Sequence, residues 1–89
     1  MSYYEVLYQK KAEKWLKENK EYGLRFYKAF IEISKDITEC FIKYDIVKLR
    51  GNTDFFRLRI GKYRAVFEIK NEQLIIIVIN IDSRGGIYK

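Results

Sequence analysis

Residues 54–70 read DFFRLRIGKYRAVFEIK, and this stretch decides the fold. Apolar and polar side chains alternate, with few exceptions, over residues 55–60 and again over residues 63–70, which is the period of a half-buried β-strand. Gly61 and Lys62 separate the two runs, and a two-residue connection that contains glycine is typical of a tight hairpin turn. The stretch therefore predicts an antiparallel hairpin with one apolar face.

The polar face of this hairpin is rich in arginine. A two-residue turn brings Arg59 opposite Arg64, and Arg57 and Glu68 share their face. Like charges directly opposite each other destabilise a sheet, and Glu68 offsets only part of that cost. A face that meets a polyanion would explain the arginines, because a guanidinium group offers phosphate a planar, permanently charged fork. The alternative is a solvent-exposed face that carries arginines by chance, and the spacing alone does not separate the two.

The rest of the chain supplies a third meander strand, an N-terminal strand and two amphipathic helices. The predicted elements are a strand at 3–8, helices at 10–19 and 24–34, and strands at 55–60, 63–70 and 74–81. This βααβββ order predicts an α+β domain spanning residues 1–89, in which a helical hairpin packs on one face of an antiparallel sheet. Residues 36–44 either extend the second helix or form an irregular connection, and residues 45–50 form a short extended lead-in.

Two details of this prediction depend on glycine and on register. Gly23 is expected in the turn that joins the two helices. In a third strand that alternates without interruption, Ile75, Ile77, Ile79 and Ile81 share the arginine face. That face would then be apolar in part, so a partner protein or another segment of the chain must cover it.

The composition narrows the chemistry that this chain can perform. Eighteen Lys and Arg residues against twelve Asp and Glu residues give a net charge of +6, which favours association with nucleic acid or acidic proteins. The sequence contains no histidine and one cysteine, Cys40, which is expected in the core, so histidine bases and an intramolecular disulfide are excluded. We therefore expect neither a metal nor a cofactor. The longest apolar run, residues 74–79, is too short for a membrane span and the N-terminus lacks a signal-peptide pattern, so we expect a cytoplasmic protein.

The last residues, SRGGIYK at 83–89, place an arginine and a tyrosine after the final strand. The glycine pair lets the chain turn back, which could bring Arg84 and Tyr88 to the edge of the arginine face. An aromatic ring beside arginines can stack on an exposed RNA base. The tail therefore adds two candidate residues to the polar face.

Three stretches resemble the RelE/ParE superfamily of toxins from type II toxin–antitoxin systems. They are KLRGN at 48–52, DFFRLRIGKYRAVFE at 54–68 and IDSRGGIY at 81–88. The resemblance to the RelE-like branch implies a βααβββ fold over the whole chain. It also implies a toxin that inhibits translation as a ribosome-dependent mRNA endonuclease, an mRNA interferase, through metal-independent attack of a ribose 2′-hydroxyl on the adjacent phosphate. The implied partners are the ribosome, mRNA and an acidic RelB-like antitoxin, with no membrane.

The resemblance also assigns roles to individual residues. It implies that the catalytic residues are Arg64, Arg84 and Tyr88, and that the RNA phosphate-binding residues are Arg57, Arg59, Lys48 and Arg50. Arg57 and Arg59 occupy positions that are lysine in well-known members, and an arginine does not give up its proton in a protein. These two are therefore expected to bind phosphate, and Tyr88, acidified by neighbouring arginines, becomes a candidate general base. The identity of the base stays open.

Two other functions are compatible with the same fold. One is a ParE-like protein that poisons DNA gyrase by binding it, without catalysis. The other is a non-catalytic basic domain that binds nucleic acid in a salt-dependent manner. The joint presence of Arg64, Arg84 and Tyr88 favours RNA cleavage over both.

Overall fold

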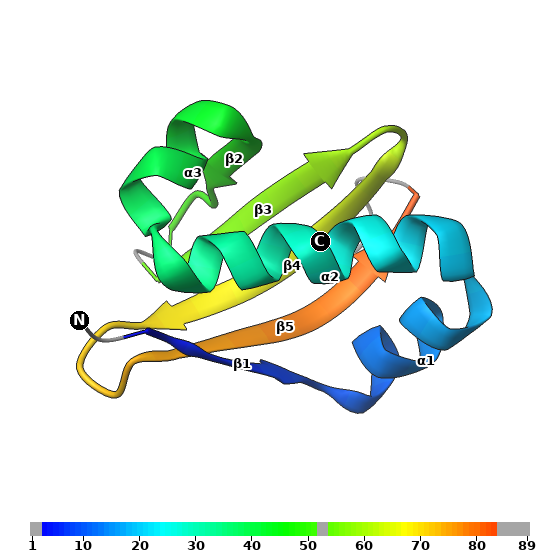
Figure 1. Ribbon diagram of the computed structural model, residues 1–89, viewed down its shortest axis with the longest axis horizontal. Helices are drawn as coiled ribbons and strands as arrows, with labels where there is room; N and C mark the ends of the chain where they lie inside the picture. Colours follow the sequence, from blue (N-terminus) through cyan, green and yellow to red (C-terminus); the bar gives the residue numbers. More distant parts are fainter. Residues whose placement is uncertain (1–2, 52–53, 84–89) are drawn as a thin grey trace.

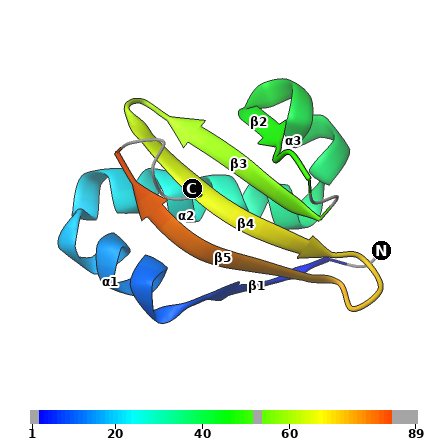
Figure 2. The same ribbon diagram turned by 180° about the vertical axis from the view of Figure 1, so that it is seen from behind.

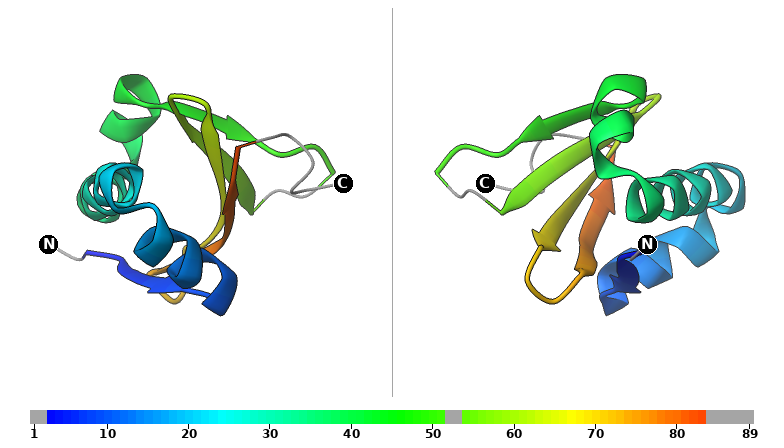
Figure 3. Two further views of the ribbon diagram at one scale, coloured as in Figure 1. Left: turned by 90° about the vertical axis from the view of Figure 1, so that its right-hand side faces the viewer. Right: turned by 60° about the vertical axis from the view of Figure 1, so that its left-hand side comes forward.

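The computed structural model describes residues 3–51 and 54–83, which form a five-stranded sheet and three helices. In chain order the elements are β1 (Glu5–Tyr8), α1 (Lys10–Glu18), α2 (Lys20–Lys35), α3 (Ile37–Lys43), β2 (Asp45–Lys48), β3 (Phe55–Ile60), β4 (Tyr63–Lys70) and β5 (Ile75–Asp82). The strand order in the sheet is β1-β5-β4-β3-β2 (Figure 1). The three described helices lie on one side of the sheet (Figure 3), and we call the opposite side the open face.

The predicted α+β class, with helices on one face of a sheet, is confirmed, and the structure adds two elements. Residues 37–43 form a separate helix, α3, because the Asp36 carboxylate accepts a hydrogen bond from the Glu39 backbone N–H at 3.0 Å and so caps its first turn. The lead-in at residues 45–48 pairs with β3 as an edge strand. β1 pairs in parallel with β5, which makes the sheet mixed; the helices and the meander supply the long connection that parallel neighbours require.

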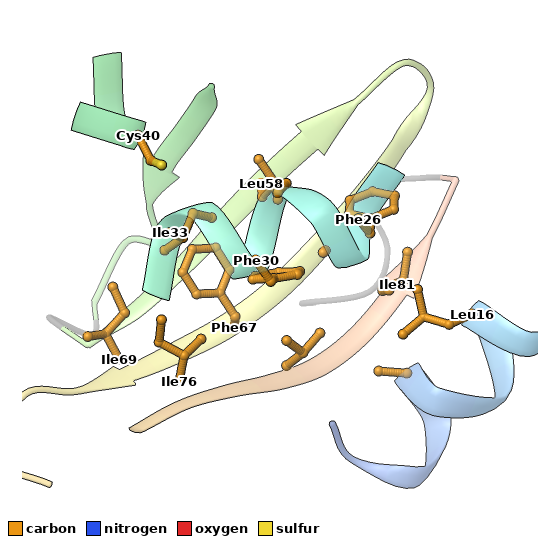
Figure 4. Close-up of a cluster of buried hydrophobic side chains, with 14 residues drawn as sticks. Leu16, Phe26, Phe30, Ile33, Cys40, Leu58, Phe67, Ile69, Ile76 and Ile81 are labelled. Carbon is orange, nitrogen blue, oxygen red and sulfur yellow. The ribbon is translucent and has the colours of Figure 1, made fainter. Parts of the chain in front are cut away.

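The β3–β4 hairpin matches the prediction in its bounds and in its register. Arg59 pairs with Arg64 across the turn at Gly61, where a φ of 61° favours glycine. The apolar side of the hairpin packs against α2, and the Phe30 ring meets the Phe67 ring edge to face at 5.2 Å between centroids (Figure 4). This core fixes which side of the hairpin is covered, so the arginine side lies on the open face.

β5 departs from the uninterrupted alternation that the sequence predicted. Val66 of β4 pairs with Asn80, but the next residue of β4, Phe67, pairs with Val78. Ile79 is therefore an extra residue in β5, and the strand contains a β-bulge at this point.

The bulge changes which residues of β5 reach the open face. Before it, Ile75 and Ile77 lie on the open face, as predicted. After it, Ile81 is only 3% exposed and belongs to the core, so the prediction that Ile81 shares the arginine face is wrong. Asn80 and Asp82 take the open-face positions instead, because the inserted residue reverses the alternation.

The junction between α1 and α2 is tighter than the predicted turn. α2 begins at Lys20, directly after Asn19, whose side-chain amide donates to the Trp15 carbonyl at 2.9 Å. Gly23 therefore lies inside α2 and is buried, and a Cβ atom at this position would lie 2.6 Å from the Leu16 carbonyl oxygen. The prediction that Gly23 lies between two elements is wrong. Glycine is needed because the helices approach too closely for a methyl group.

Candidate functional site

A row of four charged residues crosses the open face at one end of the sheet. The register pairs Asp45 with Arg59, Arg59 with Arg64, and Arg64 with Asp82. We call these four residues the charged row, to which β2, β3, β4 and β5 each contribute one side chain. Figure 2 shows the four strands from this side. Directly opposed residues point to the same face, so two cations lie side by side in the middle and a carboxylate lies at each end.

The carboxylate at one end explains part of how the sheet tolerates two opposed arginines. Asp45 Oδ2 lies 3.2 Å from Arg59 Nε, and both side chains are about half exposed. A pair this exposed contributes at most about 1 kcal/mol to folding. Glu68, which the sequence offered as the compensating charge, instead lies 3.3 Å from the Lys70 ammonium group.

Arg57 and Arg64 are more buried than Arg59. Both are half-buried, and Arg57 lies opposite Val47 on one side and Val66 on the other. The Arg64 Nε atom is buried and has no hydrogen-bond acceptor within residues 3–51 and 54–83. A buried donor without an acceptor costs about 1–3 kcal/mol. A hydrogen-bond acceptor supplied by a ligand at Arg64 would offset that cost.

Away from the charged row, the open face is mixed, because the Glu68–Lys70 ion pair of β4 lies beside apolar side chains of β5 and β1. Ile75 and Ile77 of β5 lie there, and Ile77 pairs with Leu7 of β1, which is 40% exposed. The expectation of a face that is only partly polar is therefore confirmed for Ile75 and Ile77. The open face therefore carries the charged row at one end of the sheet and a group of apolar side chains, from Ile75, Ile77 and Leu7, on β5 and β1.

The structure brings three of the predicted site residues together and separates two others from them. The three that share the open face, which we call the arginine cluster, are Arg57, Arg59 and Arg64. Lys48 pairs with Phe56, which packs against the core, so strand alternation directs Lys48 to the helix side of the sheet. Arg50 is exposed in the turn that follows β2. Arg84 and Tyr88, which are predicted to be catalytic, lie outside the described residues.

The sequence interpretation missed the two carboxylates of the charged row. Asp45 is the single acidic residue in the short extended segment before the arginine-rich strand. That pattern is a signal for a cross-strand ion pair, because opposite charges stabilise neighbouring strands. Asp82 gives no comparable signal, because it reaches the open face only through the bulge in β5.

Other reactive groups are few in the described part of the chain. Within it, no three His, Cys, Asp or Glu side chains are grouped as a metal ion would require. Cys40 is buried in the core, and burial raises the pKa of its thiol, with the Glu32 and Asp36 carboxylates adding to the effect. Such a thiol is a weak nucleophile. No helix in these residue ranges has the length and hydropathy of a membrane span.

Comparisons with known proteins agree with one another. The sequence model of the family described as "ParE toxin of type II toxin-antitoxin system, parDE" matches residues 6–88. RelE1 of Methanocaldococcus jannaschii is 34% identical over 86 residues, which cover 97% of this chain and 96% of that protein. A chain in the archaeal RelE-RelB complex from Pyrococcus horikoshii OT3 superposes with a TM-score of 0.78 at 26% identity, covering 97% of this chain and 99% of that one. The RelB-RelE complex from Methanococcus jannaschii gives 0.71 at 26% identity, covering 94% and 96%.

Proposed function

Since the chain belongs to the RelE/ParE superfamily of toxins from type II toxin–antitoxin systems, we propose that it is a RelE-like, ribosome-dependent mRNA endonuclease that inhibits translation in the cytoplasm. The observation that carries this proposal is the arginine cluster. Arg57, Arg59 and Arg64 lie on neighbouring strands of one open face, and two of them are half-buried. Guanidinium groups at fixed positions suit the phosphates of an RNA strand.

The proposed reaction rearranges bonds at one phosphate of the RNA. The ribose 2′-oxygen attacks the adjacent phosphorus, the bond from phosphorus to the 5′-oxygen of the next nucleotide breaks, and the products are a cyclic phosphate and a 5′-hydroxyl. A base takes the proton from the 2′-hydroxyl, and the leaving 5′-oxygen receives a proton. Negative charge develops around the phosphorus, and positioned cations that stabilise such charge are usually the largest catalytic contribution.

Each arginine of the cluster has a role in this proposal. Arg64 is the clamp on the scissile phosphate, because its partly buried guanidinium group loses little freedom when it binds. Arg57 and Arg59 bind phosphate, because an arginine keeps its proton and cannot act as the base. Tyr88 as the base and Arg84 as the cation at the leaving oxygen stay predictions that rest on the family resemblance.

The two remaining predicted cations lie near the β2 end of the sheet. Arg50 is exposed just after β2, and Lys48 is exposed but directed to the helix side. We assign both to phosphates beyond the cut site, where the RNA strand passes the edge of the sheet. Their contribution is sequence-independent and decreases as salt increases.

An acidic RelB-like antitoxin is the proposed protein partner. The similar chains from Pyrococcus horikoshii and Methanococcus jannaschii are in complexes with RelB. This chain has a net charge of +6, and exposed apolar side chains lie on both sides of it: Leu7 on the open face, and Leu24 and Ile31 on α2. A partner with acidic and apolar residues could therefore neutralise the arginine cluster and cover these side chains.

Primer extension on mRNA in translating ribosomes tests the proposed activity. The wild-type protein should cut mRNA in the ribosomal A site. Arg64→Ala should reduce cleavage by about 10²-fold or more, as losing one transition-state contact typically does. Lys14→Ala is the matched control, since it removes an exposed cation from α1 on the helix side and should cut like wild type. Translated mRNA that stays intact with wild-type protein would refute the enzymatic proposal.

The matching family model favours one alternative, a ParE-like protein that inhibits DNA gyrase by binding it. In that case the arginine cluster would contact protein or DNA, and no RNA bond would break. A gyrase supercoiling assay separates the two functions. Inhibition of supercoiling that survives Tyr88→Phe, together with intact mRNA in the ribosome assay, would select the alternative.

A further inference from the structure

A second basic site lies around the edge of the sheet from the arginine cluster. It is a groove of about 410 Å³, which we call the basic groove. Four cations line it, namely Arg25 and Lys28 of α2, Lys43 at the end of α3, and Arg59 of β3. One carboxylate, from Asp45, also lines the groove.

The groove exists because β2 covers only part of the edge of β3. The first pair between the two strands joins Asp45 to Arg59, so Ile60 lies beyond the described ladder on that side. α2 runs across the sheet near this point, and α3 lies beside β2 at the sheet edge (Figure 1). Three different parts of the chain therefore contribute side chains to one recess.

The side chains that line the basic groove carry more positive charge than the neighbouring carboxylates neutralise. Lys43 Nζ lies 2.7 Å from Glu32 Oε1, and Arg59 is paired with Asp45. The two cations from α2 have no carboxylate within ion-pair distance among residues 3–51 and 54–83. Both side chains are exposed, and the Arg25 guanidinium group lies 4.8 Å from the centroid of the Tyr22 ring, so neither cation is neutralised before an anionic ligand binds.

We infer that the basic groove holds the phosphodiester backbone of the mRNA strand next to the nucleotide that is cut, an inference that rests on the proposed function. Arg59 lines the groove and also lies opposite Arg64, so a strand in the groove continues directly onto the open face. The Tyr44 ring, with Lys43 Nζ 5.5 Å from its centroid, offers a surface on which a base can stack. The excess of positive charge around the groove is the feature that favours a phosphodiester backbone as its occupant.

Binding of a single-stranded 2′-O-methyl RNA oligonucleotide tests this inference, because that RNA lacks the 2′-hydroxyl that the reaction needs. Fluorescence anisotropy at a series of salt concentrations compares wild type, the Arg25→Gln/Lys28→Gln protein and a control, Lys14→Gln/Lys17→Gln, which removes two exposed cations from α1. The control should bind like wild type. The groove variant should bind more weakly, and its slope of log affinity against log salt should be smaller by about 1.4, at about 0.7 for each lost phosphate contact. Unchanged melting temperatures establish that the variants are folded.

The possible outcomes separate this inference from the proposed function. A reduced slope in the groove variant alone supports the groove as an RNA site, even if wild-type protein cuts no mRNA and the enzymatic proposal fails. Equal slopes in the groove variant and the control overturn the inference, whether or not mRNA is cut. A third outcome also overturns the inference: the groove variant binds the oligonucleotide like wild type, but binds mRNA-free ribosomes or an acidic antitoxin more weakly. The groove would then serve that other partner.

Discussion

Replacing Gly23 with alanine should destabilise the protein, although alanine is the better helix former. In an unobstructed helix this change adds about 0.5–1 kcal/mol of stability. Here the new Cβ atom would lie 2.6 Å from the Leu16 carbonyl oxygen and 3.3 Å from the Leu16 Cα atom. Both are backbone atoms, so no side-chain rotation relieves the contact, and α1 must move away from α2.

That movement disturbs packing that the two helices share. Leu16 and Phe26 are almost fully buried, and the Trp15 ring meets the Phe26 ring edge to face at 5.7 Å between centroids. Overpacking of a core costs about 1–3 kcal/mol, which exceeds the gain in helix propensity. The mid-range values of these two terms give a net loss of about 1 kcal/mol. In a domain of this size, each kcal/mol lowers the Tm by about 4–8 °C.

Thermal and urea unfolding of the Gly23→Ala protein measure this effect. Leu24→Ala is the control, because Leu24 is 58% exposed on the same helix and its truncation should change the free energy of unfolding by about 0.5 kcal/mol or less. Gly23→Val, with a larger side chain, should lose more stability than Gly23→Ala. A Gly23→Ala protein that is as stable as wild type would refute the reasoning, because the helices would then leave room for a methyl group.

Three further expectations concern charge and burial. The hydrogen bond from Lys43 lowers the pKa of Glu32, so the ion pair contributes to the free energy of unfolding above the ordinary pKa of 4.5, and this contribution is lost as the pH falls through the lower folded pKa. Glu32→Gln should remove that part of the acid sensitivity when urea unfolding is measured at a series of pH values. A pH profile identical to that of wild type would contradict this. Asp45→Asn should change the free energy of unfolding by less than about 1 kcal/mol, because the ion pair that it removes is exposed. The same change should tighten binding of an RNA oligonucleotide, because Arg59 loses its carboxylate partner. An unchanged or lower affinity for the oligonucleotide counts against the proposed role of Arg59. Cys40 should react with a thiol reagent only after unfolding, because it is buried and its thiol pKa is raised; rapid labelling of the native protein would disagree.

The β3–β4 hairpin could be predicted from the sequence because its determinants are local. Alternation within residues 55–70 assigns each side chain to a face, and the two-residue turn at Gly61 sets the register. Arg59 opposite Arg64 therefore required no knowledge of distant segments. The helix over 10–18 was predictable for a similar reason, because its apolar residues recur at helical spacing.

The rest of the candidate site depends on contacts between segments that are far apart in the sequence. Asp45 enters the charged row through β2, a strand of four residues that is too short for its pairing to be predicted from periodicity. Asp82 enters it through the bulge in β5, and the need for glycine at Gly23 comes from the approach of two helices. All three result from packing rather than from a local pattern. The roles of Arg84 and Tyr88 come from the family resemblance and stay predictions.

The parallel pairing of β1 with β5 has a consequence for the order in which the fold can assemble. Glu5 pairs with Ile75 and Tyr8 with Val78, so the strand that is synthesised first finds its neighbour only when the last described strand has been made (Figure 1). Contacts between such distant segments form late, because the chain must first close a long loop. Asp82, at one end of the charged row, lies on that same last strand. Assembly of the open face therefore waits for β5, so a nascent chain that ends before this strand carries only three of the four residues of the charged row.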